Sequence, residues 1–456
     1  MARGKKAAQE LTPEEKLAQA LVPMEEQPYQ IPENWCWAYL EKIYCVNPKN
    51  DAEDDVDAAF IPMEKISAGM QNDYTFEIQP WKKAKKGHTQ FADGDVAFAK
   101  ISPCFENRKS MIAENLPNGI GGGTTELIVL RQPKILSKYT FWLISDENFI
   151  QGGKNTYSGT VGQQRISMDY VRNYRVPLPP LAEQQRIVDR IESIFAKLDE
   201  AKEKAQAVVD GFEMRKSAIL HKAFTGELTA KWREEHRVEK ESWKKKSIDD
   251  LCYSLKYGTA KKSEKEGSVV VVRMGNLQNG EIDWTDLAYT NDAEDIKKYR
   301  LDPGDVLFNR TNSPALVGKT AVYRGTYPAV YAGYLIKLDY KRDELNGYFL
   351  NYAMNTSRAK AYCNAVKTDG VNQSNINAKK IGAFVIEVPK LEEQIEIVRI
   401  LDGLLAKENA AKEAAESVLG QIDTMKKAVL ARAFRGELGT NDPAEESAIE
   451  LLKTML

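Results

Sequence analysis

Residues that form disulfides or metal sites are scarce in this sequence. It has 5 cysteines and 3 histidines. The cysteines are scattered without a CxxC motif, and the histidines form no cluster. Structural zinc needs closely spaced Cys and His ligands, so we expect reduced thiols and no metal site.

Long apolar runs are also missing. No stretch reaches the roughly 18 residues that a membrane-spanning helix requires. The start, "MARGKKAAQE", has no apolar segment behind its charges, so it does not resemble a secretory signal. We therefore expect an unprocessed cytoplasmic protein. Its 456 residues, 43% of them hydrophobic, allow about three domains with sizeable cores.

A strong charge of one sign is absent as well. The net charge is −2, so any nucleic-acid hypothesis must rest on local basic patches and on architecture.

Motifs for catalysis are missing too. "SPALVGKT" at 313–320 resembles a phosphate-binding loop, but Ser313 stands where that motif needs glycine. There is no GxGxxG motif, no Ser-His-Asp signal and no (N/D)PP(Y/F) methyltransferase motif. We therefore predict no catalytic residues and no enzyme activity for this chain alone.

What the sequence does contain is a long internal repeat. "PLPPLAEQQRIVDRIE" covers 177–192, and "EVPKLEEQIEIVRIL" covers 387–401. The same offset of 210 residues relates "GDV" at 94–96 to 304–306 and "AFTGEL" at 223–228 to "AFRGEL" at 433–438. Solenoid units run only roughly 20–50 residues. We interpret the repeat as a duplicated module with the same frame and different intervening text.

Each module has two predicted parts. The first mixes short strands, such as "GDVAFAKI" and "GDVLFNR", with helical segments such as "KYTFWLISDENFI". The second is a long helix in which apolar residues step by 4 and 3, as in a coiled coil. A merely amphipathic surface helix is the alternative. The main seam positions are Ile191, Leu198, Phe212 and Arg215 in the first helix and Leu401, Glu408 and Ile422 in the second.

The two modules share the repeated motifs but differ in the sequence between them, which suggests two related but distinct ligands. The long helices would hold the two binding domains at a fixed separation. DNA with two half-sites fits that arrangement. Lysine and arginine neutralise phosphates, and Gln, Asn and Arg pair with base edges. The alternative for any single lysine is a solvated surface position. The candidate DNA-binding residues are Lys82, Lys83, Lys100, Lys109, Gln163, Gln164, Arg165, Lys261, Arg310, Asn312, Lys319, Asn372, Gln373 and Asn375.

This arrangement resembles the specificity subunit of Type I restriction–modification systems. The resemblance rests on the variable part, "PLPPLAEQQRIVDRI", the long helix ending "ILHKAFTGELT", and the second copy ending "VLARAFRGEL". The second copy differs slightly, with "VPKLEEQ" for "PLPPLAEQ". The resemblance covers nearly the whole chain. A coiled-coil scaffold that binds only proteins is the alternative.

The resemblance implies a non-catalytic reader of a bipartite, asymmetric DNA site. Its partners would be double-stranded DNA, two adenine-N6 methyltransferase subunits and motor-nuclease restriction subunits. S-adenosylmethionine, ATP and Mg would belong to those partners, with no cofactor in this chain. The implied fold is α+β, with two pseudo-twofold-related mixed α/β target-recognition domains separated by an antiparallel two-helix coiled coil.

The expected domain boundaries follow from the repeat. They are an N-terminal extension with a short helix (1–30), target-recognition domain 1 (31–180), spacer helix 1 (181–230), a linker (231–242), target-recognition domain 2 (243–390), spacer helix 2 (391–438) and a C-terminal helical tail (439–456).

If the two spacer helices run antiparallel, the polar seam residues set a register. Placing Arg215 opposite Glu408 brings Ala201 to Ile422 and Phe212 to Ala411, so small residues face large ones. The pair would then neutralise two charges that are costly to bury singly. Two alternatives stay open: both side chains reach water at the edge of the seam, or a one-heptad slip offers Lys222 to Glu408.

Overall fold

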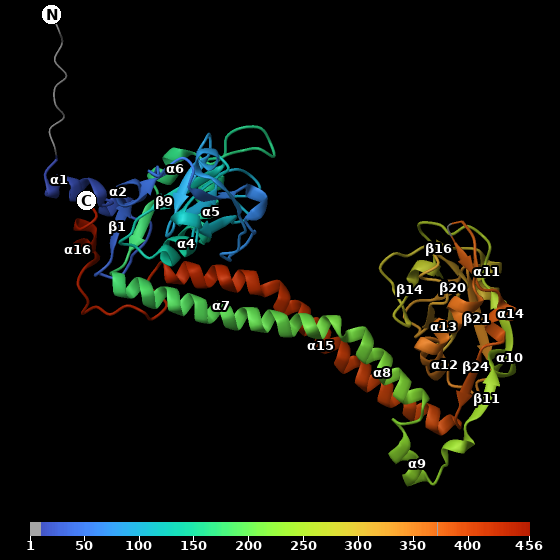
Figure 1. The fold of residues 1–456 in the computed structure, drawn as a ribbon. Coiled ribbons are helices and arrows are strands. Elements are labelled where there is room, and N and C mark those ends of the chain that lie inside the picture. Colours follow the sequence, from blue (N-terminus) through green and yellow to red (C-terminus); the bar gives the residue numbers. More distant parts are fainter. Residues whose placement is uncertain (1–10, 372) are drawn as a thin grey trace, which may run out of the picture. The chain divides into compact units, whose positions relative to one another are not determined.

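The computed structural model describes residues 11–371 and 373–456. The chain divides into two compact units, one formed by residues 1–204 and 418–456 and the other by residues 205–417. Each unit contains one mixed α/β domain together with a part of each long helix (Figure 1). No helix in the described part of the chain is long and apolar enough to cross a membrane.

The first unit contains ten strands and the helices that cover them. Its helices are α1 (Pro13–Ala20), α2 (Leu40–Ile43), α3 (Trp81–Ala84), α4 (Ser137–Ser145), α5 (Glu147–Lys154), α6 (Met168–Arg172), most of α7 (Leu181–Asp210), the end of α15 (Leu391–Ala433) and α16 (Ala448–Lys453). Its strands are β1 (Cys36–Tyr39), β2 (Cys45–Val46), β3 (Asp57–Ile61), β4 (Glu77–Pro80), β5 (Thr89–Ala92), β6 (Val96–Ala99), β7 (Ser110–Ile112), β8 (Ile120–Gly123), β9 (Leu127–Arg131) and β10 (Arg175–Leu178).

The second unit repeats this order with additional short strands. Its helices are the end of α7, α8 (Phe212–Phe224), α9 (Ala230–His236), α10 (Ile248–Leu251), α11 (Ala293–Tyr299), α12 (Gly347–Met354), α13 (Ser357–Val366), α14 (Ala378–Gly382) and most of α15. Its strands are β11 (Lys244–Ser247), β12 (Cys252–Tyr257), β13 (Val269–Val272), β14 (Leu277–Gln278), β15 (Glu281–Ile282), β16 (Tyr289–Thr290), β17 (Val306–Asn309), β18 (Thr311–Asn312), β19 (Thr320–Val322), β20 (Ala329–Tyr331), β21 (Leu335–Tyr340), β22 (Thr368–Asp369), β23 (Ser374–Asn375) and β24 (Val385–Val388).

The sheets of the two units share a common frame. The antiparallel order β2-β9-β6-β7 of the first corresponds to β12-β21-β17-β19 of the second. A parallel pair, β3 with β8 and β13 with β20, also recurs. The second unit adds the hairpin β14-β15 and the small sheet β18-β23-β22. The predicted α+β fold with two related domains is therefore confirmed. The hairpin and the small sheet that only the second domain has show where the two domains differ.

The repeated Gly-Asp turns begin the central strands β6 and β17. Gly94 and Gly304 have φ values of +88° and +89°, a left-handed conformation that glycine adopts without steric cost. The aspartates that follow are buried and paired: Asp95 with Arg131 and Asp305 with Lys337. A buried carboxylate needs such a partner, so the turn is fixed by backbone conformation and charge together.

The helical segments show three departures from expectation. "KYTFWLISDENFI" forms two helices, because Asp146 ends α4 and caps the first turn of α5 through its side chain. The first spacer helix is interrupted at Gly211, so α7 and α8 are separate helices. The C-terminal helix begins after Ser447, and Pro443 lies before it rather than in its first turn. The short N-terminal helix, by contrast, forms as predicted, and Thr12 and Glu15 make a capping box at its start.

The long helices form part of the core of each domain. In the first unit, Ile187 and Ile191 of α7 and Leu430 of α15 lie in one buried cluster with the strand residues Val96 and Leu130. In the second unit, Leu220 of α8 and Ile397 of α15 belong to the cluster that contains β17 and β21 residues. Each domain is thus fastened to a helix pair by a continuous apolar core.

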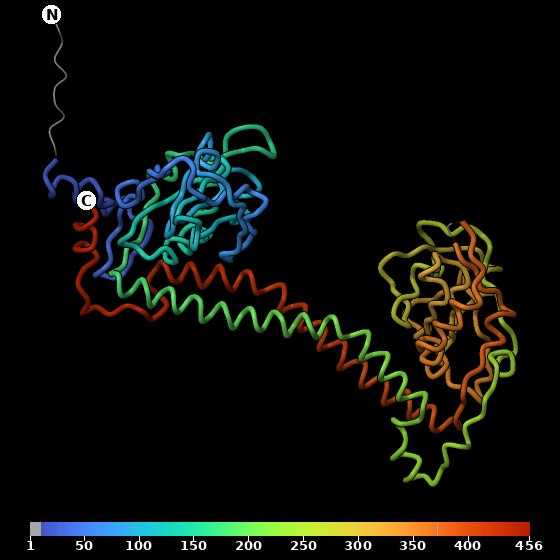
Figure 2. Tube along the Cα trace, viewed as in Figure 1, coloured from blue at the N-terminus to red at the C-terminus, as the bar shows by residue number. Residues whose placement is uncertain are grey.

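The C-terminal segment contacts α1 and the residues that follow it in the first unit. Lys16 of α1 donates to the carbonyl of Leu456 over 3.2 Å, and the Ala448 amide donates to the Asn34 carbonyl over 2.8 Å. α16 accordingly lies beside α1 (Figure 1). In the second unit, the corresponding stretch is one continuous segment that runs from α8 through α9 to β11 (Figure 2).

Candidate nucleic-acid interface and helix frame

The start of α7 is held by two fully buried polar residues, Glu183 and Gln184. The carboxylate of Glu183 accepts hydrogen bonds from Trp35 Nε1 over 2.7 Å and from Asn441 Nδ2 over 2.9 Å. Gln184 accepts from the Leu136 amide over 3.1 Å and donates to the carbonyl before the helix. These two side chains therefore join α7 to the domain and to the C-terminal segment.

The start of α15 repeats the arrangement with Glu393 and Gln394, both fully buried. Trp243 Nε1 donates to Glu393 over 2.9 Å, and Arg233 Nη1 forms an ion pair with it at 2.8 Å. Gln394 accepts from the Asn346 amide over 2.8 Å. A buried carboxylate with both oxygens hydrogen-bonded is satisfied, so the Leu-x-Glu-Gln motif is a structural clamp at the start of each helix.

Sequence reasoning missed this role. The helix dipole favours negative charge at a helix start, so the position of these glutamates alone does not indicate that they are buried. The signal that could have revealed burial is the tryptophan directly before the first strand of each domain, Trp35 before β1 and Trp243 before β11, together with the glutamine that follows each glutamate. An indole N–H buried in a domain usually requires an acceptor.

The predicted contact between Arg215 and Glu408 is present in the second unit. Arg215 Nε lies 2.7 Å from Glu408 Oε2, and Nη2 donates to the Val208 carbonyl over 2.8 Å. Gly211 makes this possible, since a Cβ at that position would lie 2.5 Å from Arg215 Nη1. The arginine thus spans the interruption between α7 and α8 and fixes the antiparallel register of this helix pair.

Other seam positions agree only in part. Ile191, Leu401 and Ile422 are buried, and Leu198 is partly buried. Phe212 is buried as well, but Ala411 is exposed and the ammonium of Lys412 lies 5.0 Å from the Phe212 ring centroid.

Two predicted seam residues are exposed. The 4-and-3 spacing of the second long helix also places Val418 and Met425 on the seam, and both are exposed, so that part of the assignment was wrong. Ile422, which lies between them in the helix, is buried. In the first unit, Phe195 takes a buried place with Lys426 over its ring at 5.0 Å.

The candidate residues of the first domain occupy separate places. Lys82 and Lys83 are exposed on α3. Lys100 is half-buried, and Lys109 donates to the Met63 carbonyl over 3.0 Å, so its ammonium is directed into the domain. Of the candidate residues of this domain, only Gln163, Gln164 and Arg165 lie together, in one loop.

That loop connects α5 and α6 and carries Gln163, Gln164 and Arg165. Gln163 is exposed and Gln164 is half-buried. Arg165 contacts both oxygens of Glu126, at 2.9 and 2.7 Å. The hydrogen bonds from Arg165 lower the pKa of the Glu126 carboxyl, while partial burial opposes the shift. The arginine of this loop is therefore already neutralised by a carboxylate.

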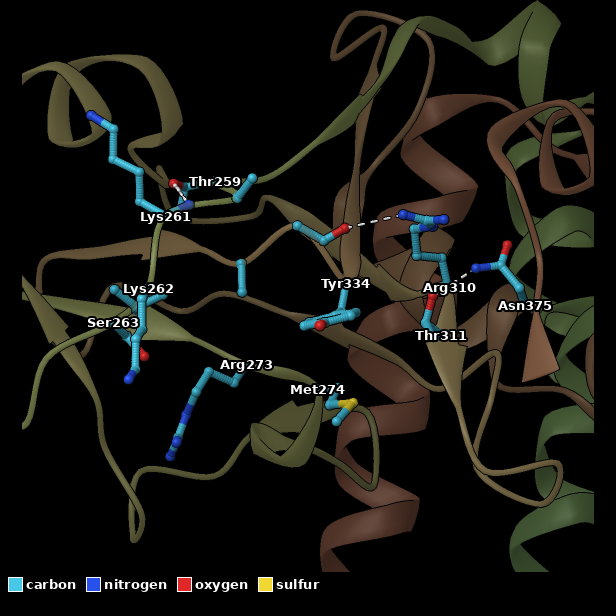
Figure 3. Close-up of a pocket in the computed structure, with 14 residues that line it drawn as sticks. Thr259, Lys261, Lys262, Ser263, Arg273, Met274, Arg310, Thr311, Tyr334 and Asn375 are labelled. Carbon is cyan, nitrogen blue, oxygen red and sulfur yellow. Dashed lines mark hydrogen bonds between the residues drawn. The ribbon is translucent and has the colours of Figure 1, made fainter. Parts of the chain in front are cut away.

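In the second domain, three predicted residues line one cavity of about 720 Å³ (Figure 3). They are Lys261, Arg310 and Asn375. Lys261 pairs with Asp292 at 2.7 Å, and this hydrogen bond raises the lysine pKa. Asn375 Nδ2 donates to Thr311 Oγ1 over 2.8 Å. Residues far apart in sequence thus converge on one concave surface.

The other candidates of this domain lie outside the cavity lining. The Lys319 ammonium contacts Gln278 Oε1 at 2.7 Å, and burial lowers its pKa. Asn312 accepts from the Ser313 amide through its own side chain. Gln373 is exposed, and Asn372 lies outside the described residues.

No metal site accompanies these surfaces. Within residues 11–371 and 373–456, no group of three His, Cys, Asp or Glu side chains is placed to hold an ion. Burial raises the pKa of Cys36 and Cys252 to about 12 and that of Cys363 to about 11. These thiols are therefore protonated at neutral pH and serve as core residues.

Comparison with known proteins relates the frame to one family. The family model described as Type I restriction modification DNA specificity domain matches residues 48–209 and 240–418. The specificity subunit of the Type I restriction enzyme EcoAI from Escherichia coli is 40% identical over 199 residues, which cover 43% of this chain and 34% of that protein. The EcoKI specificity subunit of E. coli K12 is 29% identical over 278 residues, 59% of each chain. The matched regions thus span about a third to three fifths of these relatives.

Solved structures agree on the fold. The HsdS subunit from Thermoanaerobacter tengcongensis aligns with a TM-score of 0.67 at 20% identity, covering 91% of this chain and all of that one. A structure described as the basis of complex assembly and conformational transition of the type I R-M system aligns with a TM-score of 0.64 at 20% identity.

Proposed function

Because the chain belongs to the family of Type I restriction–modification DNA specificity subunits, we propose that it reads a bipartite, asymmetric DNA site. Each mixed α/β domain binds one half-site, and the antiparallel helix pair sets their separation. The observation that carries this proposal is the contrast within the repeat. The helix starts keep the same buried contacts, while the candidate surfaces differ in charge and hydrogen bonding.

The chain itself acts as a non-catalytic subunit in this proposal. Two adenine-N6 methyltransferase subunits and motor-nuclease restriction subunits assemble on it, and S-adenosylmethionine, ATP and Mg belong to those partners. The support is family membership together with the duplicated frame, which offers two equivalent attachment places. The complex works in the cytoplasm, where chromosomal and incoming DNA are accessible.

The decisive experiment is methylome sequencing of a host that expresses this chain with its methyltransferase partner. We expect one split motif with adenine-N6 methylation on both strands. Replacing residues 31–180 by the corresponding domain of another family member should change one half of the motif and leave the other half and the spacer unchanged. A change in both halves would contradict the modular assignment.

A protein-only scaffold is the competing function. Filter binding with random duplex DNA separates the two, because DNA-binding subunits retain DNA through phosphate contacts that weaken steeply with salt. A chain that co-purifies with a methyltransferase but retains no DNA at low salt would favour the scaffold.

A further inference from the structure

Arg310 differs from Lys261 and Arg273 of the same cavity, which both have acidic partners. Within the described residues it forms no ion pair; its Nη1 donates only to the Gly333 carbonyl, over 3.4 Å. Its Nε is buried and has no hydrogen-bond partner. A buried donor without an acceptor costs about 1–3 kcal/mol, so its place in the structure calls for an explanation.

The position of the guanidinium is fixed by an aromatic ring. Its Cζ lies 4.8 Å from the centroid of Tyr257, within the range of a cation–π contact. The residue sits between β17 and β18, on the sheet that faces the cavity. A planar donor group stacked in this way keeps its edge available and loses little conformational entropy on binding.

The walls of the cavity suit a nucleobase. The Tyr334 ring, 53% exposed, and the side chain of Met274 lie below Arg310 in Figure 3, and Asn375 lies on its other side. Because Asn375 donates to Thr311 through Nδ2, its carbonyl oxygen is oriented by that bond. Aromatic surface, a guanidinium and a fixed amide are the groups with which proteins contact base edges.

Two of the other three cations that line the cavity are neutralised, and the third, Lys262, is exposed and forms no ion pair within the described residues. Lys261 pairs with Asp292 at 2.7 Å and Arg273 pairs with Asp286 at 2.9 Å. Arg310 is therefore the arginine of this surface with its charge uncompensated.

The first domain lacks this arrangement. The residue at the position of Arg310 is Lys100, and the residue at the position of Asn375 is Arg165. Arg165 is bound by both oxygens of Glu126. The two reading surfaces thus present different donors at equivalent points of one frame.

We propose that Arg310 reads a guanine, through N7 and O6 in the major groove, in the half-site bound by the second domain. Arginine is the side chain that matches these two acceptors at once, whereas lysine offers a single point charge. This assignment rests on the proposed DNA-reading function and adds the identity of one base to it.

The test combines variants with modified DNA in the complete complex with the methyltransferase partner. The wild-type motif should contain a guanine in the half that remains when residues 31–180 are exchanged. Arg310→Ala should lower discrimination at that guanine by about 10- to 100-fold and leave the other half unchanged. Arg310→Lys should keep binding but lose most of the discrimination. Replacing that guanine with 7-deazaguanine should weaken wild-type binding about 10-fold and leave Arg310→Ala unaffected.

Arg324→Ala is the matched control. Arg324 lies in the same domain but is bound by both oxygens of Glu281, at 2.8 and 2.6 Å, so its removal should leave the motif unchanged. Equal weakening of Arg310→Ala on all sequences would show a phosphate contact and overturn the proposal. So would a second half-site without guanine, or one indifferent to 7-deazaguanine. A wild-type complex that yields no split motif would instead refute the DNA-reading function itself.

Discussion

Gln184 and Gln394 share two contacts in the two halves, and Gln394 adds a third to the Glu344 carbonyl, whereas Arg165 and Asn375, also 210 residues apart, share none. Each glutamine accepts from a backbone amide of its domain and donates to the carbonyl of the proline two residues before its helix. By contrast, Arg165 pairs with a carboxylate and Asn375 bonds a threonine hydroxyl. The frame contacts depend largely on backbone groups, which all sequences supply. Surface residues can therefore vary without moving the helix on which the domain is mounted.

Within the frame, the two buried glutamates differ in one respect. Glu393 is neutralised by Arg233, whose side chain is only 11% exposed. Glu183 instead receives hydrogen bonds from the neutral donors Trp35 and Asn441. The difference follows from connectivity, because Arg233 lies on the continuous α9 segment while Asn441 lies on the C-terminal tail. One site is a buried ion pair and the other a hydrogen-bonded carboxylate.

The largest effect we expect is from Glu393→Ala. This change leaves the Arg233 charge without a partner, which should cost about 3–5 kcal/mol in the free energy of unfolding of the second unit. Glu183→Ala leaves only neutral donors unpaired, and we expect about 1–3 kcal/mol in the first unit. Urea titration with pulsed thiol labelling distinguishes the units, since Cys36 and Cys363 are buried in the first and second unit respectively.

The matched controls are Glu393→Gln and Glu183→Gln. Each keeps the shape of the side chain and removes the charge. Glu393→Gln should remain clearly destabilising because Arg233 still lacks an anion, while Glu183→Gln should be milder. Equal costs for the two alanine variants would show that the ion pair adds nothing to the second site.

The next largest loss of stability is expected on replacing either buried glutamine at the start of a long helix, and it should be similar in the two halves. Gln184→Ala and Gln394→Ala each leave a buried backbone amide without its acceptor, so each should cost about 1–3 kcal/mol. The two values should agree within about 1 kcal/mol, because the amides of Leu136 and Asn346 are the equivalent donors. Gln394→Ala should be the larger, because Gln394 also donates to the Glu344 carbonyl over 2.9 Å. Labelling of Cys36 for the first variant and of Cys363 for the second measures both. A difference above 1 kcal/mol would show that the frame is not equivalent.

The sequence predicted the repeat, the Gly-Asp strands, the helix starts and the contact of Arg215 with Glu408, because these depend on local periodicity or on an exact offset. It did not predict the interruption at Gly211. That interruption arises because Arg215 folds back over a position without a Cβ to reach Val208, a three-dimensional contact that no period encodes. For the candidate surface, charge and loop position identified Lys261, Arg310 and Asn375, which converge. The inward direction of Lys109 and Lys319 depends on carbonyl acceptors from distant segments.

A smaller effect on stability is expected at the contact between Arg215 and Glu408. A double-mutant cycle of Arg215→Met and Glu408→Gln should give a coupling of about 0.5–1 kcal/mol, because the side chains are 37% and 24% exposed and solvent screens the pair. Arg215→Met alone should cost more than Glu408→Gln, since it also removes the bond to Val208. Cys363 labelling in urea measures each variant. A coupling indistinguishable from zero would mean that the pair does not contribute to the register.

The smallest effect on stability concerns the candidate surface of the first domain and depends on pH. The hydrogen bonds from Arg165 hold the pKa of the Glu126 carboxyl below its ordinary value of 4.5. A lowered folded-state pKa contributes stability that is present above the ordinary value and is lost as pH falls through the lowered one. Arg165→Gln should therefore be slightly destabilising at pH 7, because the pair is exposed to solvent, and progressively less so below pH 4.5. Asn375→Ala in the second domain removes a bond to a hydroxyl that does not titrate, so its cost should be the same throughout this range.

Urea unfolding followed by tryptophan fluorescence between pH 7 and the lowest pH at which the native state persists measures both. An Arg165→Gln cost that stays constant with pH would mean that Glu126 does not hold Arg165, and the contrast between the two surfaces would then lose its electrostatic basis.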